Sequence, residues 1–84
     1  MPELARFYGI IIKMFYSGTE HNRPHIHAMY AEYMGSIDIR TRKLIVGDLP
    51  NKAMQLIVEW ISLHEEELLE IWETQVFKKI PPLD

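Results

Sequence analysis

Apolar residues at helical spacing fill the C-terminal third of this chain and constrain its fold most strongly. They recur on one face of a helix from Ala53 to Trp72. Pro50 suits the first turn of such a helix, because its missing N–H would lack an intrahelical partner there anyway. We therefore predict helical structure over about residues 50–76. Ser62–Glu65 has the spacing of a capping box, which predicts a kink or a break into two helices at that point.

Strand-like segments precede the helix. The first, Phe7–Tyr16, is apolar at nearly every position and rich in aromatic and β-branched residues, which predicts a strand buried on both faces. A later segment alternates cleanly, with Ile37 and Ile39 on one face, which is typical of a half-buried strand. The four predicted strands span about residues 7–16, 25–31, 34–40 and 43–46.

These elements predict an α+β fold. The most economical arrangement is a four-stranded antiparallel meander followed by a long C-terminal helical segment, which packs on the Ile37/Ile39 face. Eighty-four residues suffice for one small domain, so we assign residues 1–84 to a single domain.

Composition restricts the compartment and the partners. The chain has no cysteine, so disulfides and thiolate metal sites are excluded. Its N-terminus resembles no secretory signal and no apolar run is long enough for a membrane span, so we expect a cytoplasmic protein without a membrane partner. A formal net charge of −3 does not favour RNA as a partner. Local cations at Arg40, Arg42 and Lys43 leave a small RNA or phosphate contact open.

Two histidines mark the candidate site. His25 and His27 are two residues apart in a predicted strand, so both side chains lie on the same face. Matching the apolar faces of the hairpin, with a turn around Glu32-Tyr33, places His27 opposite Asp38 and His25 opposite Arg40. An imidazole and a carboxylate on neighbouring strands can then form a hydrogen bond.

These side chains suit acid/base chemistry on a phosphodiester. Such a reaction needs two proton carriers and a cation for the developing charge. The candidate catalytic residues are His25, His27, Asp38, Arg40 and Arg23. In this hypothesis Asp38 orients His27, and Arg23 or Arg40 holds the anion.

The same region allows two other interpretations. His21, His25 and His27 can supply three imidazoles to a divalent metal such as Zn²⁺ or Ni²⁺, with Asp38 or Glu32 as a carboxylate ligand. The histidines can also be ordinary surface residues.

Other conspicuous residues are interpreted as structural. His64 lies on the apolar helical stripe and is expected in the core, with a hydrogen bond to Trp60 or a backbone carbonyl. Trp60 and Trp72 are interpreted as core anchors. The first strand would expose an apolar face and an open edge, which homodimerisation, a partner chain or the tail Ile80-Pro81-Pro82-Leu83 would cover.

Four motifs along the chain resemble one bacterial family. They are Phe7-Tyr8-Gly9-Ile10, Pro24-His25-Ile26-His27-Ala28, Gly47-x-Leu49-Pro50 and Glu59-Trp60-x-x-x-His64-x-x-Glu67-Leu68-Leu69-x-x-Trp72. Together they are similar to the family called Domain of Unknown Function 4160. The resemblance extends to the closing Lys79-Ile80-Pro81-Pro82-Leu83.

The resemblance implies a small bacterial cytoplasmic protein, often encoded beside another small protein, in gene pairs that have been suggested to be toxin–antitoxin-like. Two functional hypotheses follow. The chain is a component of such a module, acting through its His-x-His surface by metal-free RNA cleavage. Alternatively, it is a non-catalytic interaction or dimerisation domain that binds a metal through the same histidines. The sequence leaves open whether the chain is an enzyme.

Overall fold

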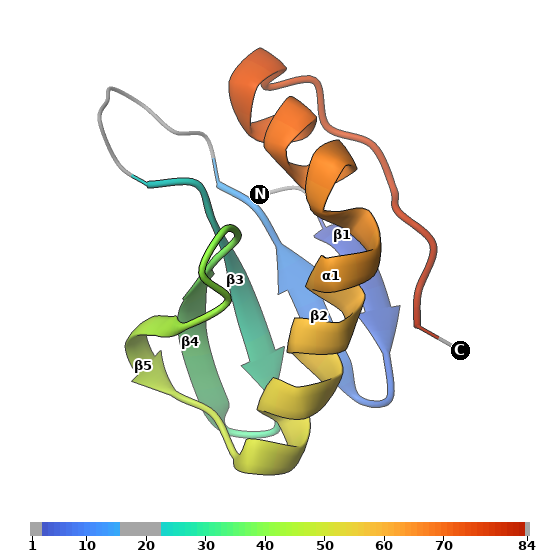
Figure 1. Cartoon of the computed structure of the whole chain (residues 1–84). Coiled ribbons are helices and arrows are strands. Elements are labelled where there is room, and N and C mark those ends of the chain that lie inside the picture. Colours follow the sequence, from blue (N-terminus) through green and yellow to red (C-terminus); the bar gives the residue numbers. More distant parts are fainter. Residues whose placement is uncertain (1–2, 16–22, 84) are drawn as a thin grey trace.

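The computed structural model describes residues 3–15 and 23–83 and has an α+β fold (Figure 1). Five strands form one antiparallel sheet in the order β1-β2-β3-β4-β5, and one helix follows them. The strands are β1 (Glu3–Phe7), β2 (Ile10–Lys13), β3 (His25–Tyr30), β4 (Tyr33–Asp38) and β5 (Leu44–Asp48), and the helix is α1 (Asn51–Thr74). The predicted class and meander topology are confirmed, with one strand more than expected.

The additional strand comes from a hairpin inside the apolar first segment. Tyr8 and Gly9 form a two-residue turn with φ of 49° and 81°, which joins β1 to β2. Positive φ at both turn positions matches the twist of a tight hairpin, and glycine adopts it without strain. The prediction of one strand over 7–16, buried on both faces, is therefore wrong. Ile10 and Ile12 point into the core, while the residues between and after them are only half-buried.

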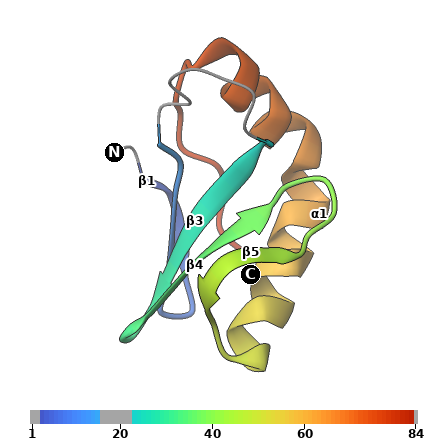
Figure 2. The same cartoon turned by 90° about the vertical axis from the view of Figure 1, so that its left-hand side faces the viewer.

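Helix α1 covers one face of the sheet, as Figure 2 shows from the side. Trp60, Ile57 and Ile61 of the helix are fully buried, and so are Ile37 and Ile39 of the sheet. All five belong to one hydrophobic core. The helix thus packs on the predicted Ile37/Ile39 face. We call the opposite sheet face, turned away from α1, the outer face.

Helix α1 is interrupted at His64, whose φ of −126° and ψ of 23° are not helical. The kink lies within the segment Ser62–Glu65, where it was predicted. The predicted capping box does not form, because the Ser62 hydroxyl donates to the carbonyl of Val58. His64 is half-buried and bonds Glu67 through Nδ1, at 3.1 Å, rather than Trp60 or a carbonyl. No helix within the described residues is long and apolar enough to span a membrane.

The C-terminal tail closes the core beside β1 (Figure 1). The backbone N–H of Ile80 donates to the carbonyl of Leu4 at 2.8 Å, and the indole N–H of Trp60 donates to the carbonyl of Pro81 at 2.9 Å. Ile80 is only 2% exposed. The tail therefore covers core side chains and occupies part of the β1 edge.

Candidate functional site

The β3–β4 hairpin carries the candidate site and differs from its predicted register. Its two-residue loop is Ala31-Glu32, with Ala31 at a φ of 54°, so the chain turns one position earlier than predicted. His25 is consequently opposite Asp38, and His27 is opposite Ser36. Each histidine therefore pairs with a β4 residue two positions before the predicted one. A shift of two residues keeps every side chain on its predicted face of the sheet, but the predicted cross-strand partners of the histidines are wrong.

The two imidazoles lie together on the outer face. Their ring centroids are 5.0 Å apart, with the rings inclined at 65°. The His27 and Phe15 rings form a T-shaped contact at a centroid distance of 4.0 Å, and the His25 ring contacts Trp72 at 5.0 Å. Both histidines are therefore held by aromatic neighbours, and each remains only partly covered.

Hydrogen bonding fixes the neutral tautomer of His25. Its Nδ1 lies 2.8 Å from the backbone oxygen of Arg23. A carbonyl can only accept, so Nδ1 carries the proton and Nε2 keeps its lone pair when the ring is neutral. Protonation of Nε2 would add a donor without breaking this bond. His25 can thus hold and release a proton at Nε2 while its ring stays in place.

His27 has a different environment. Its Nδ1 lies 3.3 Å from the hydroxyl oxygen of Ser36. Burial, reinforced by the neighbouring His25, lowers the pKa of His27 to about 4. The imidazole is therefore neutral at physiological pH, with a lone pair on one nitrogen. The two histidines thus differ in their partners: Nδ1 of His25 bonds a backbone carbonyl, and Nδ1 of His27 faces the Ser36 hydroxyl.

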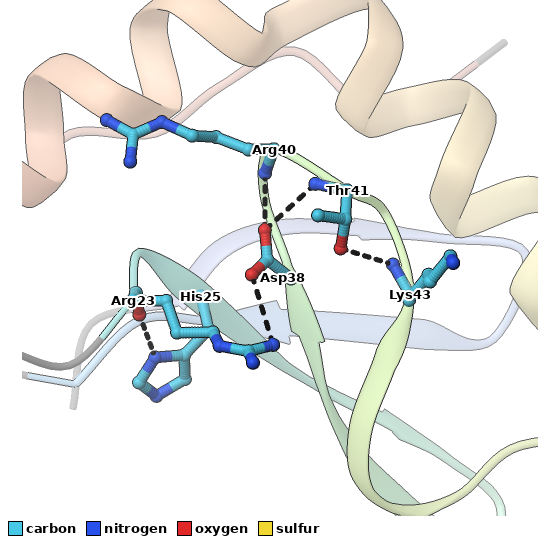
Figure 3. Close-up of polar contacts among 6 residues, drawn as sticks. All are labelled: Arg23, His25, Asp38, Arg40, Thr41 and Lys43. Atoms are coloured by element: carbon cyan, nitrogen blue, oxygen red, sulfur yellow. Dashed lines mark hydrogen bonds and ion pairs between the residues drawn. The ribbon is translucent and has the colours of Figure 1, made fainter.

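Asp38 serves the backbone rather than an imidazole (Figure 3). Its Oδ1 accepts from the backbone N–H groups of Arg40 and Thr41 at 2.7 and 2.9 Å. Its Oδ2 lies 3.5 Å from a guanidinium nitrogen of Arg23, and the carboxylate is almost fully buried. The predicted orientation of His27 by Asp38 is wrong, because the loop between β4 and β5 folds back over this carboxylate.

The two arginines lie differently from the prediction. Arg23 contacts both strands of the site hairpin: its guanidinium pairs with Asp38 of β4, and its backbone carbonyl accepts a hydrogen bond from His25 of β3. The side chain of Arg40 extends away from the His25 imidazole toward the helix in Figure 3. There Arg40 lines a hollow with Glu70 and Glu73. Arg23 thus lies beside the histidine pair, whereas Arg40 does not.

A cation that the sequence analysis missed lies nearer to His27. Lys13 of β2 is the direct cross-strand partner of His27, so Lys13, His27 and Ser36 form one row across three strands. The lysine lies inside the apolar segment Phe7–Tyr16, and its face was not assigned because that segment was interpreted as buried on both sides. Trp72, predicted as a core anchor, is half-buried, and its ring contacts His25 at the first residue of the central strand β3.

The row lies in a groove of about 390 Å³ on the outer face, which we call the outer groove. Its lining includes Lys13, Phe15, His27, Met29, Met34 and Val46. Met34 and Val46 are 59% and 63% exposed. The groove therefore combines apolar and aromatic walls with one lysine and one neutral imidazole.

The metal interpretation depends partly on His21, which lies outside the described residues. Within 3–15 and 23–83 no three acidic or imidazole side chains come together as a metal site. His25 and His27 alone provide two imidazoles, one fewer than the usual minimum for a protein-bound Zn²⁺. A metal at this position stays a prediction.

Comparison with known proteins places the chain in a family. A family model described as "Domain of unknown function (DUF4160)" matches residues 9–73, which include every described site residue named above. No curated protein and no solved structure matches the chain. The match covers most of the 84 residues, and the chain therefore belongs to the DUF4160 family.

Proposed function

We propose that this protein is a component of a two-gene, toxin–antitoxin-like module and that its outer face cleaves RNA without a metal. One observation carries the proposal. Two imidazoles with ring centroids 5.0 Å apart lie on the outer face of the sheet in different environments: Nδ1 of His25 bonds a backbone carbonyl, whereas burial lowers the pKa of His27 to about 4. Metal-free cleavage of a phosphodiester requires one group that accepts a proton and one that donates a proton.

The roles follow from the two environments. His27, neutral at physiological pH, accepts the proton of the ribose 2′-hydroxyl, and the 2′-oxygen forms a bond to phosphorus. The bond from phosphorus to the 5′-oxygen breaks, and that oxygen takes a proton from Nε2 of His25. The products are a 2′,3′-cyclic phosphate and a 5′-hydroxyl. A bound phosphate favours the cationic form of His27 and so raises its low pKa toward neutrality during the reaction.

Lys13 replaces Arg40 as the cation of the site. The lysine is the cross-strand neighbour of His27 and lines the same groove. Its ammonium can reach the non-bridging oxygens of a phosphate beside His27 and stabilise the developing charge. Arg23 holds His25 through its backbone carbonyl, which makes it a positioning residue.

Growth of a bacterial culture after induction tests the proposal in the cell. The wild-type chain should arrest growth and degrade RNA, whereas His25→Asn and His27→Asn should not. His64→Gln, a histidine change outside the site, should arrest growth like the wild type, provided that all variants have similar melting temperatures. Arrest by a folded double variant of His25 and His27 would contradict catalysis by the pair.

A second candidate function is a protein-interaction domain. The observation that favours it is the edge strand β5, where Ile45 and Val46 are 41% and 63% exposed. A register shift opposite Ser36 and Ile37 marks a bulge in β5, which lets the consecutive apolar side chains of Ile45 and Val46 both be exposed. Such an edge can pair with a strand of a partner, for example the product of the neighbouring gene.

Homodimerisation through the first strand stays a prediction: β1 is an edge strand of the sheet, and the tail bonds to it at Leu4. Co-purification with the product of the neighbouring gene separates the two functions. Loss of binding in Ile45→Lys, with binding kept in the histidine variants and no RNA cleavage by the wild type, would favour the interaction domain.

A further inference from the structure

The geometry points to a substrate class for this site: single-stranded RNA, with one base seated in the outer groove next to His27. This inference rests on the proposed function and deepens it. The groove joins apolar walls to a cationic end, which matches a nucleotide, since a nucleotide joins a flat, weakly polar ring to an anion.

The walls of the groove suit a base. Phe15 at one side offers an aromatic ring, and Met29 and Met34 offer flexible thioethers that adapt to a flat ligand. Val46, 63% exposed, forms the opposite rim. Gly47 also lines the groove and has no side chain to fill it. A Cβ at this position would lie 2.3 Å from the carbonyl oxygen of Met34, so a larger residue does not fit.

The anion-binding end lies beside the imidazoles. Lys13 and His27 are direct cross-strand neighbours, so a base held between Phe15 and Val46 has its phosphate within reach of the lysine and of the proton acceptor. Bound in this way, the substrate presents its scissile group to the histidine pair. The groove therefore provides orientation as well as affinity.

Charge is distributed in a way that permits an anionic ligand. Helix α1 holds six glutamates and one lysine, a formal net charge of −5, against −3 for the whole chain, so the rest of the chain carries +2. The helix lies on the opposite side of the sheet from the outer face (Figure 2). The six glutamates of α1 therefore lie on the side of the sheet away from the outer groove, which Lys13 lines.

A groove of this kind selects single strands. In a duplex the bases are stacked and paired, and the major groove of A-form RNA is too narrow for side chains to reach them. A base can lie against Phe15 only when it is free to leave the stack. We expect the protein to bind single-stranded RNA at least tenfold more tightly than a duplex of the same sequence.

Fluorescence anisotropy with a labelled 2′-O-methyl oligonucleotide tests the inference, because this probe lacks the 2′-hydroxyl and cannot be cleaved. Val46→Glu and Met34→Glu, both at exposed groove positions, should weaken binding at least tenfold. Leu63→Glu is the matched control, since Leu63 is 65% exposed and lies on the helix. It introduces the same charge and should change affinity less than twofold.

The outcomes distinguish base binding in the outer groove from RNA cleavage by the histidine pair. Equal weakening by Val46→Glu and Leu63→Glu, or no preference for the single strand, would overturn the groove as a base site. Unchanged binding in both groove variants would do the same and would leave the groove to a partner protein. Cleavage by His25 or His27 variants, with groove-dependent binding intact, would instead overturn the proposed function and spare this inference.

Discussion

The rings of His25 and His27 lie 5.0 Å apart at their centroids, yet their Nδ1 atoms have different partners. His25 donates to a backbone carbonyl and keeps Nε2 available, whereas His27 faces the hydroxyl of Ser36. The same-face geometry of a strand thus produces two imidazoles with different properties. The predictions below test this arrangement and the scaffold that holds it.

Stability should fall in acid because of His27. The pKa of His27 in the folded state is about 4, below the usual value of 6.5. Between these two values the unfolded state binds more protons, so the contribution of His27 is fully present above pH 6.5 and is lost as the pH falls toward 4. Urea unfolding at pH 7 and pH 4.5 should show a smaller loss of stability for His27→Asn than for the wild type. An equal loss in both proteins would show that this pKa is not lowered.

Removing the Asp38 carboxylate should destabilise the protein without acting through His27. Asp38→Ala leaves two backbone N–H groups and Arg23 without their acceptor, which we expect to cost about 2 to 3 kcal/mol. Asp38→Asn retains one acceptor oxygen and should cost less. The exposed Asp48→Ala is the control and should change stability by less than about 0.5 kcal/mol. A shift of the His27 resonances to a new tautomer in Asp38→Asn would instead support an orienting role.

A side chain at position 47 should disrupt the β4–β5 pairing. Gly47 has a φ of 94°, and an added Cβ would lie 2.3 Å from the carbonyl oxygen of Met34 and 2.7 Å from the Cα of Gly35. Backbone must move, so Gly47→Ala should cost about 3 kcal/mol or more in unfolding free energy. Gly9→Ala is a matched comparison, because it has a positive φ but meets only the Tyr30 ring at 3.5 Å. It should cost about 1 to 2 kcal/mol, and equal losses would contradict this account of position 47.

The tail should contribute to folding through Ile80. This side chain is buried in the core and its N–H is bonded to Leu4. Ile80→Ala should lower the unfolding free energy by about 2 to 4 kcal/mol. Val76→Ala, in the same tail but at a position 69% exposed, should change it by less than about 0.5 kcal/mol. Similar values for the two variants in chemical denaturation would show that the tail is not part of the core.

The helix, the hairpin faces and the shared face of the two histidines were predictable because they depend on periodicity. The apolar spacing along α1 and the alternation along β4 assign side chains to the correct face even when the position of a turn is predicted wrongly. The β1–β2 hairpin was missed because its turn, Tyr8-Gly9, lies inside an apolar run and has only one turn-forming residue. The β3–β4 register was missed because Ala31 turns with a positive φ that alanine rarely adopts.

The partners within the site depend on features that the sequence does not display. Asp38 is held by the backbone of a loop that returns over it, and that path is set by tertiary structure. Lys13 lies at the site because β2 pairs with β3 in the register that makes Lys13 the partner of His27. The register error at the β3–β4 turn therefore placed Arg40 opposite His25, and the missed β1–β2 turn left the face of Lys13 unassigned, while the histidine pair was placed correctly on one face.

Cleavage of a defined single-stranded RNA by the purified protein in EDTA is the most direct test of catalysis by the His25/His27 pair. The wild type should yield a 2′,3′-cyclic phosphate and a 5′-hydroxyl, and His25→Asn and His27→Asn should each reduce the rate at least a hundredfold. Lys13→Ala should reduce it as well, and Arg40→Ala should not. Cleavage that EDTA abolishes, or that folded histidine variants retain, would contradict metal-free catalysis by this pair.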